Sequence, residues 1–199
     1  MTTTRPDSRT RQSLAQSPST PPETLAILAR DLASRVREAV ATNPATPADA
    51  LSRLATDREE WVHTAVAANP ATPPDVLAVL ATSQEFGIRR CAALNSSTPA
   101  DVLVALASDR SHWVREAVAQ NPSTPADTLA QLESDDNEWV SEVVAQRPST
   151  PPAVLARLAR IGSERVRTAV ARNPSTPADT LALLASDSSC AVRRAAVRS

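Results

Sequence analysis

The chain has 199 residues, of which 42% are apolar and 2% aromatic, and its net charge is −1 from 21 basic and 22 acidic residues. This length is typical of one or two domains, and the even charge balance excludes a wholly basic nucleic-acid-binding domain. Two glycines are too few for a β-rich fold with many tight turns, so Ala, Leu and Val must pack closely spaced helices instead.

The N-terminal segment 1–16 is polar and uneven in composition. We expect residues 1–16 to be a disordered N-terminal tail, because they contain too few apolar side chains to offset the entropy of ordering. They also lack the apolar stretch of a signal peptide. No other run approaches the ~18 apolar residues of a membrane span, so we expect no membrane association.

The two cysteines, Cys91 and Cys190, are far apart and not in a metal-binding spacing. We therefore expect reduced thiols, no metal, no cofactor and a cytoplasmic location. Every basic residue is Arg, which together with the abundant Ala and Pro indicates a GC-rich, bacterial genome.

A Thr-Pro pair recurs every 26 residues, from Thr20-Pro21 to Thr176-Pro177, without insertion or deletion. It defines seven copies, which we expect to form a single repeat domain over residues 17–198. The copies start at Ser17, Asn43, Asn69, Asn95, Asn121, Arg147 and Asn173. A fixed period of this length is typical of a repeat architecture.

The copy from 121 to 146 shows how each repeat starts. Asn121-Pro122 ends the preceding helix, because Pro lacks an N–H and forces the residue before it toward extended geometry. Thr124 is the predicted N-cap of the next helix and Pro125 its first residue. Asp127 then lies three residues after the cap, where a carboxylate favours the helix dipole.

The same copy contains two apolar patterns at helical spacing. Leu129 and Leu132 indicate a first helix of about ten residues, and Val140 and Val144 a second helix. Asp135 lies between them, at the predicted turn. One such pair buries too little apolar surface to offset the entropy of ordering a whole repeat, so neighbouring pairs must stack. The sequence therefore predicts an all-α solenoid of seven helix–turn–helix repeats without a β-sheet.

The repeated pattern N-P-x-T-P-x-x-x-L-x-x-L-A-x-D-x-x-x-x-V-R-x-A-V-A resembles the leucine-rich repeat variant (LRV) family, and the resemblance covers residues 17–198. It implies a right-handed superhelix, and in that family one helix of each pair can be of the tighter 3₁₀ kind. The second helix also resembles that of HEAT repeats. A family member with an iron–sulfur cluster holds it in a separate Cys-rich N-terminal segment, but residues 1–16 here contain no Cys. The resemblance therefore implies no cofactor.

The three tryptophans, Trp61, Trp113 and Trp139, share one position of the repeat. One interpretation is a row of aromatic anchors for a partner, since Trp is often a binding hot spot. The other interpretation is that each Trp covers the seam between two repeats.

Arginine recurs at a second position, as Arg37, Arg89, Arg115, Arg167 and Arg193. It could form an electropositive stripe in which Arg89, Arg115 and Arg167 bind a partner. Alternatively, an Asp recurs six residues before the Arg position, and Arg–carboxylate pairs running from repeat to repeat neutralise both. Ser83 and Ile161 replace that Asp before Arg89 and Arg167, so we expect these two to be unpaired.

No motif indicates catalysis. His63 and His112 occupy different repeat positions and have no partner motif, and Glu138 with Glu142 is a poor candidate for an acid pair. We therefore expect a non-enzymatic scaffold that binds a protein or peptide along an extended surface, with the second helices on its inner side.

The alternative function is nucleic-acid binding in an Arg- and Trp-lined concave groove, as in some HEAT-like proteins, including alkylpurine DNA glycosylases. An Arg row tied to Asp would count against it. The end copies are not visibly polar caps, which leaves end-to-end self-association open.

Overall fold

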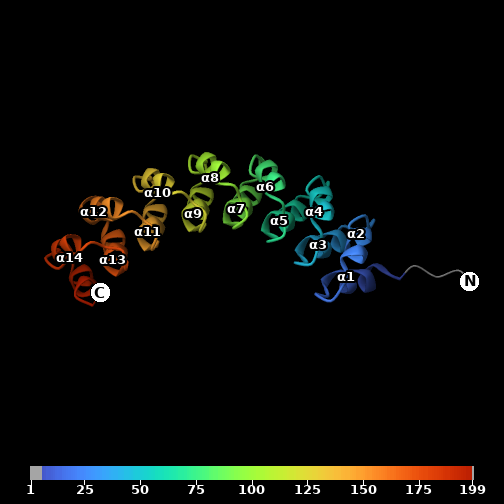
Figure 1. Cartoon of the computed structure of the whole chain (residues 1–199), viewed down its shortest axis with the longest axis horizontal. Helices are drawn as coiled ribbons and strands as arrows, with labels where there is room; N and C mark the ends of the chain where they lie inside the picture. The colour runs from blue at the N-terminus through green and yellow to red at the C-terminus, as the bar shows by residue number, and fades with distance from the viewer. Residues whose placement is uncertain (1–5, 199) are drawn as a thin grey trace, which may run out of the picture. The chain divides into compact units, whose positions relative to one another are not determined.

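The computed structural model of the chain describes residues 6–198, which form fifteen α-helices and no strand (Figure 1). The all-α prediction is therefore confirmed. The chain divides into two compact units, Met1–Val102 and Leu103–Ser199, which are considered separately below. Helix α8 (Ala100–Leu106) spans the boundary between them.

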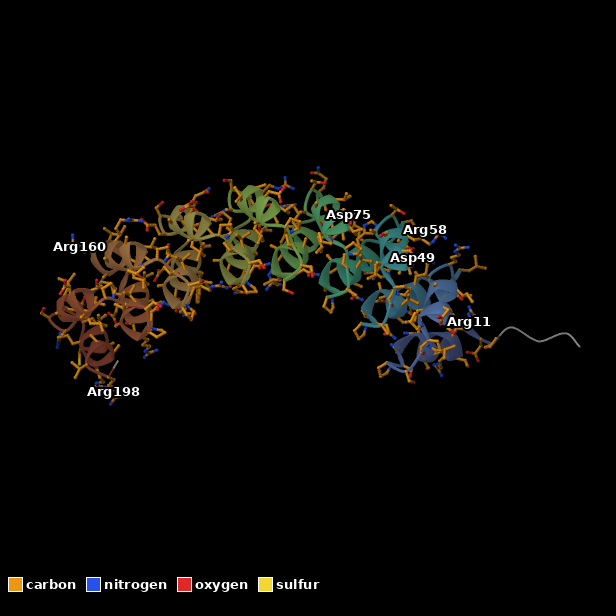
Figure 2. The ribbon with its side chains drawn as sticks, in the orientation of Figure 1. Arg11, Asp49, Arg58, Asp75, Arg160 and Arg198 are labelled. Atoms are coloured by element: carbon orange, nitrogen blue, oxygen red, sulfur yellow. The ribbon has the colours of Figure 1, made fainter. Side chains whose placement is uncertain are left out.

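The first helices of the repeats are mostly seven residues long, shorter than the sequence predicts. They are α2 (Pro22–Leu28), α4 (Ala48–Leu54), α6 (Pro74–Leu80), α8, α10 (Ala126–Leu132), the longer α12 (Pro152–Ile161) and α14 (Ala178–Leu184). Acidic residues such as Asp49 and Asp75 lie in their first turns, where they favour the helix dipole (Figure 2).

The second helices of the repeats are mostly nine residues long. They are α3 (Ser34–Thr42), α5 (Glu60–Ala68), α7 (Phe86–Leu94), α9 (His112–Gln120), α11 (Glu138–Gln146), α13 (Glu164–Arg172) and α15 (Cys190–Ala196). The implied 3₁₀ helices do not occur, because both helices of each described pair are α-helices.

Within each unit, the second helices pack side by side and the first helices lie along them. In unit 1, α3 packs between α1 (Ser8–Gln16) and α5, and α5 packs against α7. In unit 2, α11 packs between α9 and α13, and α13 packs against α15 (Figure 1). The buried side chains are the Leu of the first helices and the Val and Ala of the second. The stacked pairs confirm the solenoid class, while the right-handed twist and the single domain over 17–198 stay predictions.

The expected disordered tail is wrong for residues 8–16, which form helix α1. The side chain of Asp7 caps this helix by accepting a hydrogen bond from the Thr10 N–H at 2.8 Å. Ala15 is fully buried against the next repeat. Helix α1 occupies the place of a second helix, since Arg11 and Ala15 lie one full repeat before Arg37 and Ala41. Residues 1–5 lie outside the described part of the chain.

The repeated Thr does not cap the following helix, contrary to the prediction. Thr124 is buried, and its hydroxyl donates to the carbonyl of Val118 at 2.5 Å, near the end of helix α9. The last carbonyls of a helix have no partner within it, so a buried hydroxyl that satisfies one of them stabilises the helix end. All seven repeats make this bond, through Thr20, Thr46, Thr72, Thr98, Thr124, Thr150 and Thr176.

The Asn that opens most repeats does more than end a helix. Asn69 is buried, and its amide nitrogen donates to the carbonyls of Ala41 at 2.6 Å and Asn43 at 2.9 Å in the preceding repeat. Its carbonyl oxygen accepts from the Ala71 N–H at 2.9 Å. The same two bonds to the preceding repeat are made by Asn43, Asn95 and Asn173. Each Asn thus ties one repeat to the one before it.

Candidate functional site

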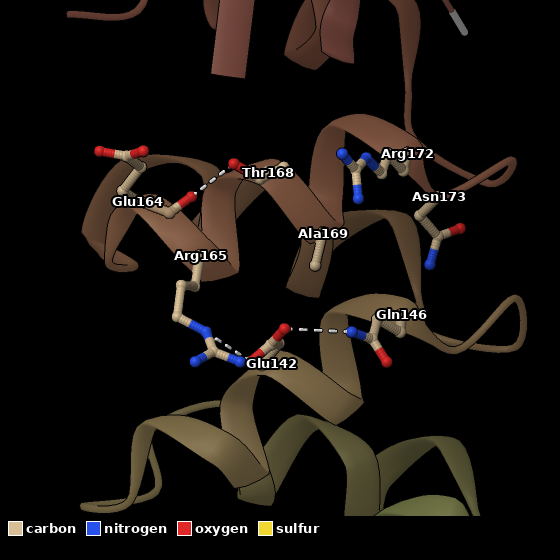
Figure 3. A pocket seen from close by; sticks show the side chains of 8 residues that line it. All are labelled: Glu142, Gln146, Glu164, Arg165, Thr168, Ala169, Arg172 and Asn173. Atoms are coloured by element: carbon tan, nitrogen blue, oxygen red, sulfur yellow. Dashed lines mark hydrogen bonds and ion pairs between the residues drawn. The ribbon is translucent and has the colours of Figure 1, made fainter. Parts of the chain in front are cut away.

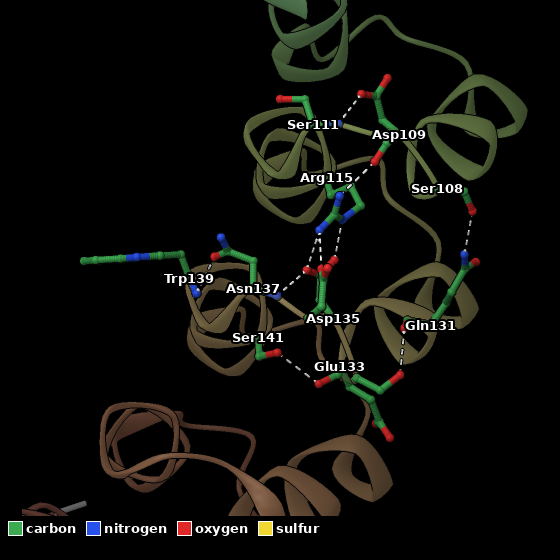
Figure 4. Close-up of polar contacts among 12 residues, drawn as sticks. Ser108, Asp109, Ser111, Arg115, Gln131, Glu133, Asp135, Asn137, Trp139 and Ser141 are labelled. Carbon is green, nitrogen blue, oxygen red and sulfur yellow. Dashed lines mark hydrogen bonds and ion pairs between the residues drawn. The ribbon is translucent and has the colours of Figure 1, made fainter.

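The repeated Arg is a structural residue that pairs with the following repeat. Arg37 is buried and holds Asp57 in a two-pronged ion pair, with Nε–Oδ2 at 2.5 Å and Nη2–Oδ1 at 2.9 Å. Its Nη1 also donates to the carbonyl of Asp31 at 2.9 Å. Such paired bonds are strong because both groups are charged and their shapes match. The same pairing joins Arg11 to Asp31, Arg115 to Asp135 and Arg167 to Asp187 (Figure 4 shows the Arg115 pair).

Each pair also fixes the turn before a second helix. The Asp57 carboxylate accepts the Glu59 N–H at 3.1 Å, and Asp187 accepts the Ser189 N–H at 2.8 Å. The hydrogen bonds from Arg37 lower the pKa of Asp57, and those from Arg167 lower the pKa of Asp187. Both aspartates are therefore held in the ionised form at neutral pH.

The expectation that Arg89 and Arg167 are unpaired is wrong. Arg167 binds Asp187 of the next repeat at 2.6 Å rather than an Asp of its own repeat. Arg89 is buried and donates to the carbonyls of Ser83 and Gln84, each at 2.8 Å. Both side chains therefore serve the stack.

The sequence contained a signal for this pairing, because the paired Arg and Asp are always 20 positions apart. Two repeats lack the Arg and have His63 and Ser141 in its place. At the same distance after them, the Asp is also missing, and Ser83 and Ile161 replace it. Arg and Asp are thus present or absent together, which indicates that they contact each other.

The tryptophans lie on the exposed side of the second helices. Trp113 in α9 and Trp139 in α11 are 48% and 55% exposed and occupy the same position of two helices that pack together. The Trp113 ring lies 4.7 Å from that of His112, centroid to centroid. Trp61, in α5 of unit 1, is 49% exposed. In none of the three is the indole buried, as it would be in a core.

Trp139 has one contact across the seam to the next repeat. The guanidinium of Arg165, which takes the Trp position in α13, lies 3.9 Å from the centre of the Trp139 ring, a cation–π geometry. Glu142 fixes this Arg through an ion pair of 2.7 Å. The seam interpretation thus applies to one face of this ring, and more than half of the residue's surface stays exposed.

Next to this cluster is a cavity of about 310 Å³ between α11 and α13 (Figure 3). Its wall includes Glu142, Gln146 and Arg165, and Gln146 donates to Glu142 at 3.2 Å. Glu164 and Arg172 complete its charged lining. The cavity is therefore polar, with side chains of both signs beside an exposed aromatic ring.

The candidate acid pair, Glu138 and Glu142, is held by other side chains. No group of three or more His, Cys, Asp or Glu side chains among them could hold a metal ion. Glu142 is bound to Arg165, and Glu138 is hydrogen-bonded to Ser163. Of the helices in this part of the chain, none has the length and apolar character that crossing a membrane requires.

Two family models match the sequence. The model described as Leucine Rich Repeat Variant domain matches residues 35–93, and the one described as Leucine rich repeat variant matches residues 112–137 and 164–189. A search of curated proteins gives no match.

Solved structures of repeat proteins are also similar to this chain. A leucine-rich repeat variant with a novel repetitive structural motif is similar with a TM-score of 0.69 and 28% identity, over 89% of this chain and 71% of that one. An engineered protein is similar with a TM-score of 0.44 and 19% identity, over 98% of this chain and 75% of that one. A designed armadillo repeat protein, solved in complex with a (KR)4 peptide, is similar with a TM-score of 0.36 and 14% identity, over 95% of this chain and 88% of that one.

Proposed function

Because the chain belongs to the leucine-rich repeat variant family, we propose that it is a non-enzymatic scaffold that binds a protein or peptide partner along the exposed side of its second helices. The observation that carries this proposal is the half-exposed pair Trp113 and Trp139 on adjacent helices, next to a polar cavity. Large aromatic side chains in such positions provide much of the binding energy at protein interfaces.

The second helices of unit 2 differ from one another where they face solvent. The position of Trp113 and Trp139 holds Arg165 and Ala191 in the next two repeats. The buried Val and Ala positions, in contrast, are nearly the same in every repeat. Positions that repeat serve the stack, whereas positions that vary are free to recognise a partner.

The predicted arginines are not part of the proposed surface. Arg115 and Arg167 are bound to aspartates, and Arg89 is buried. This pairing also removes the Arg stripe on which nucleic-acid binding depended. Trp61 belongs to unit 1 and is a separate candidate anchor.

The proposal is tested with peptides selected from a display library against the full chain. The double variant Trp113→Ala/Trp139→Ala should weaken binding of most selected peptides by about a hundredfold or more, because each anchoring Trp contributes on the order of 2 kcal/mol. Its melting temperature should fall by only about 2–4 °C, since both rings are half exposed. Binding is measured by fluorescence polarisation and melting by circular dichroism.

Phe86→Ala is the matched control, since Phe86 is a half-exposed aromatic residue of a second helix in unit 1. It should leave the affinities unchanged. Equal binding by the double Trp variant and the wild type would reject the surface. A double variant that is unfolded at room temperature would show that the tryptophans hold the seams.

A further inference from the structure

A second cavity lies farther along the same row of helices, with a volume of about 570 Å³. Its charged lining is made of Arg172, Arg194 and Arg198. Arg172 ends α13, Arg194 lies in α15, and Arg198 lies just beyond the end of α15 (Figure 2). The remaining lining residues are Pro174, Ala191 and Ala195, so the wall between the charges is small and apolar.

These three arginines differ from four other arginines of unit 2. Arg115, Arg157, Arg165 and Arg167 each form an ion pair with a carboxylate. Within the described residues, no carboxylate pairs with Arg172, Arg194 or Arg198, and all three are exposed. Among the described residues, the Arg194 side chain has a single distant contact, of 3.9 Å, to the sulfur of Cys190. The cavity therefore carries three positive charges that no described carboxylate neutralises through an ion pair.

Arg172 also lines the first cavity, so the two cavities are neighbours along α11, α13 and α15. Their charges differ. The first contains Glu142 and Glu164 and lies beside Trp139, whereas the second contains only Arg as charged residues. A ligand that follows this row therefore meets Trp139 and a cavity of mixed charge, and then a cavity of positive charge.

We propose that the cavity of Arg172, Arg194 and Arg198 binds an acidic segment of a protein partner, rich in Asp or Glu and lying along α13 and α15. This inference rests on the proposed function and names the chemistry of the partner. Guanidinium groups bind carboxylates through paired hydrogen bonds, and three of them within one cavity match several carboxylates of an extended segment. A nucleic acid fits less well, because Arg165 and Arg167, farther along the row, are bound to carboxylates and leave few charges for a longer phosphate backbone.

The test uses the full chain and a fluorescein-labelled octaglutamate peptide, with an octaglutamine peptide as its neutral counterpart. Fluorescence polarisation should show binding of octaglutamate that weakens with added salt, and no binding of octaglutamine. The variant Arg172→Gln/Arg194→Gln/Arg198→Gln should lower the affinity for octaglutamate by about tenfold or more. All three side chains are exposed, so its melting temperature should stay within about 2 °C of the wild type.

Arg30→Gln/Arg53→Gln/Arg58→Gln is the matched control, because it removes three arginines of unit 1 that also lack an ion pair among the described residues. It should change the affinity for octaglutamate by less than about twofold. An equal loss in both triple variants would show that binding follows net charge, which would overturn the proposed site. If the first variant is unfolded, Arg194→Gln/Arg198→Gln replaces it, with the same criteria.

Two further outcomes separate this inference from its premise. Short duplex DNA that binds more tightly than octaglutamate, and is lost in the same variant, would assign the cavity to nucleic acid and reject the acidic segment. If the double Trp variant binds every selected peptide normally while the Arg variant loses octaglutamate, the proposed Trp surface fails and the acidic-segment cavity stands. If the double Trp variant loses the selected peptides while the Arg variant binds octaglutamate normally, the acidic-segment cavity is rejected and the Trp surface stands.

Discussion

Arg147 is the residue that fits its repeat least well. It stands where five of the seven repeats have Asn. Its Nη1 reaches the carbonyl of Gln120 at 2.5 Å, but its buried Nε has no hydrogen-bond partner among the described residues. Burial lowers the pKa of this guanidinium, which means that the site disfavours the charge.

We predict that Arg147→Asn stabilises the protein by about 1–2 kcal/mol. The amide should donate to the carbonyls of Ala119 and Asn121, as Asn173 does one repeat later to those of Ala145 and Arg147. Urea unfolding measures the change. Arg147→Ser, which removes the charge without supplying an amide, should gain less, and a variant with Asn no more stable than the one with Ser would contradict the prediction.

Substitution of Ala for each of the two glycines should change the stability of the fold in opposite directions. A Cβ at Gly162 would lie 2.6 Å from the Leu158 carbonyl oxygen and 2.6 Å from a methyl group of Val166, whereas a Cβ at Gly87 would meet nothing within 4 Å. Gly162→Ala should therefore destabilise the fold by about 1–3 kcal/mol through overpacking. Gly87→Ala, inside helix α7, should stabilise it by about 0.5–1 kcal/mol. Thermal unfolding of both variants checks the prediction, and shifts of the same sign would contradict it.

At the scale of helices and their connections, the joint between α5 and α7 lacks the pair that the other joints described in unit 1 have. His63 stands in place of the Arg, and its Nε2 is buried without a partner among the described residues. Ser83 stands in place of the Asp, and its hydroxyl accepts the Glu85 N–H at 3.2 Å.

The double substitution His63→Arg/Ser83→Asp should restore an ion pair like that of Arg37 and Asp57. In a double-mutant cycle, we expect a favourable coupling energy of about 0.5–3 kcal/mol between the two changes. His63→Arg alone should destabilise the protein or leave it unchanged, because it buries a charge without a carboxylate. Additive effects of the two substitutions would show that residues 63 and 83 do not contact each other.

The helices themselves could be predicted because their cause is local. Thr-Pro, the Leu pair and the Val pair recur with the period of the fold, and Leu129 and Val140 are buried as the pattern predicts. The connections between repeats were harder. Whether a Thr hydroxyl caps the next helix or satisfies the previous one depends on which carbonyl lies beside it, and this is set by the stacking.

The candidate site was only partly predictable for the same reason. The tryptophans were found from their shared position, and they are exposed as a binding role requires. The role of each Arg depends on a carboxylate in another repeat, so one copy of the repeat alone does not show that Arg167 has a partner or that Arg172 lacks an ion pair among the described residues. The constant Arg-to-Asp spacing would have identified the structural pairs, and the arginines outside that spacing would then have remained as candidates.

At the scale of the whole molecule, the Arg–Asp pairs link stability to pH. The pKa values of Asp57 and Asp187 are lower in the folded protein than in the unfolded chain, where Asp titrates near 3.9. The pairs therefore contribute stability that is fully present above about pH 4 and is lost as the pH falls through the lower, folded-state values.

We predict that the melting temperature falls steeply once the pH is lowered below about 4. The variant Asp57→Asn/Asp187→Asn should melt lower than the wild type at pH 7, and its melting temperature should change less on acidification. Calorimetry between pH 7 and pH 2 measures both effects. Parallel curves for the two proteins would show that other groups cause the acid sensitivity.

The repeated bonds of Arg and Asn between neighbouring repeats join residues that are 20, 26 or 28 positions apart. When a helix pair leaves the ribosome, the preceding repeat against which it stacks has already been synthesised. The side chains and carbonyls that bind the new pair are therefore already present. Each new repeat can settle onto a folded predecessor, without waiting for a distant part of the chain. If the solenoid grows by one repeat at a time, the apolar faces of its helices stay covered during synthesis, when an incomplete chain is most prone to aggregate.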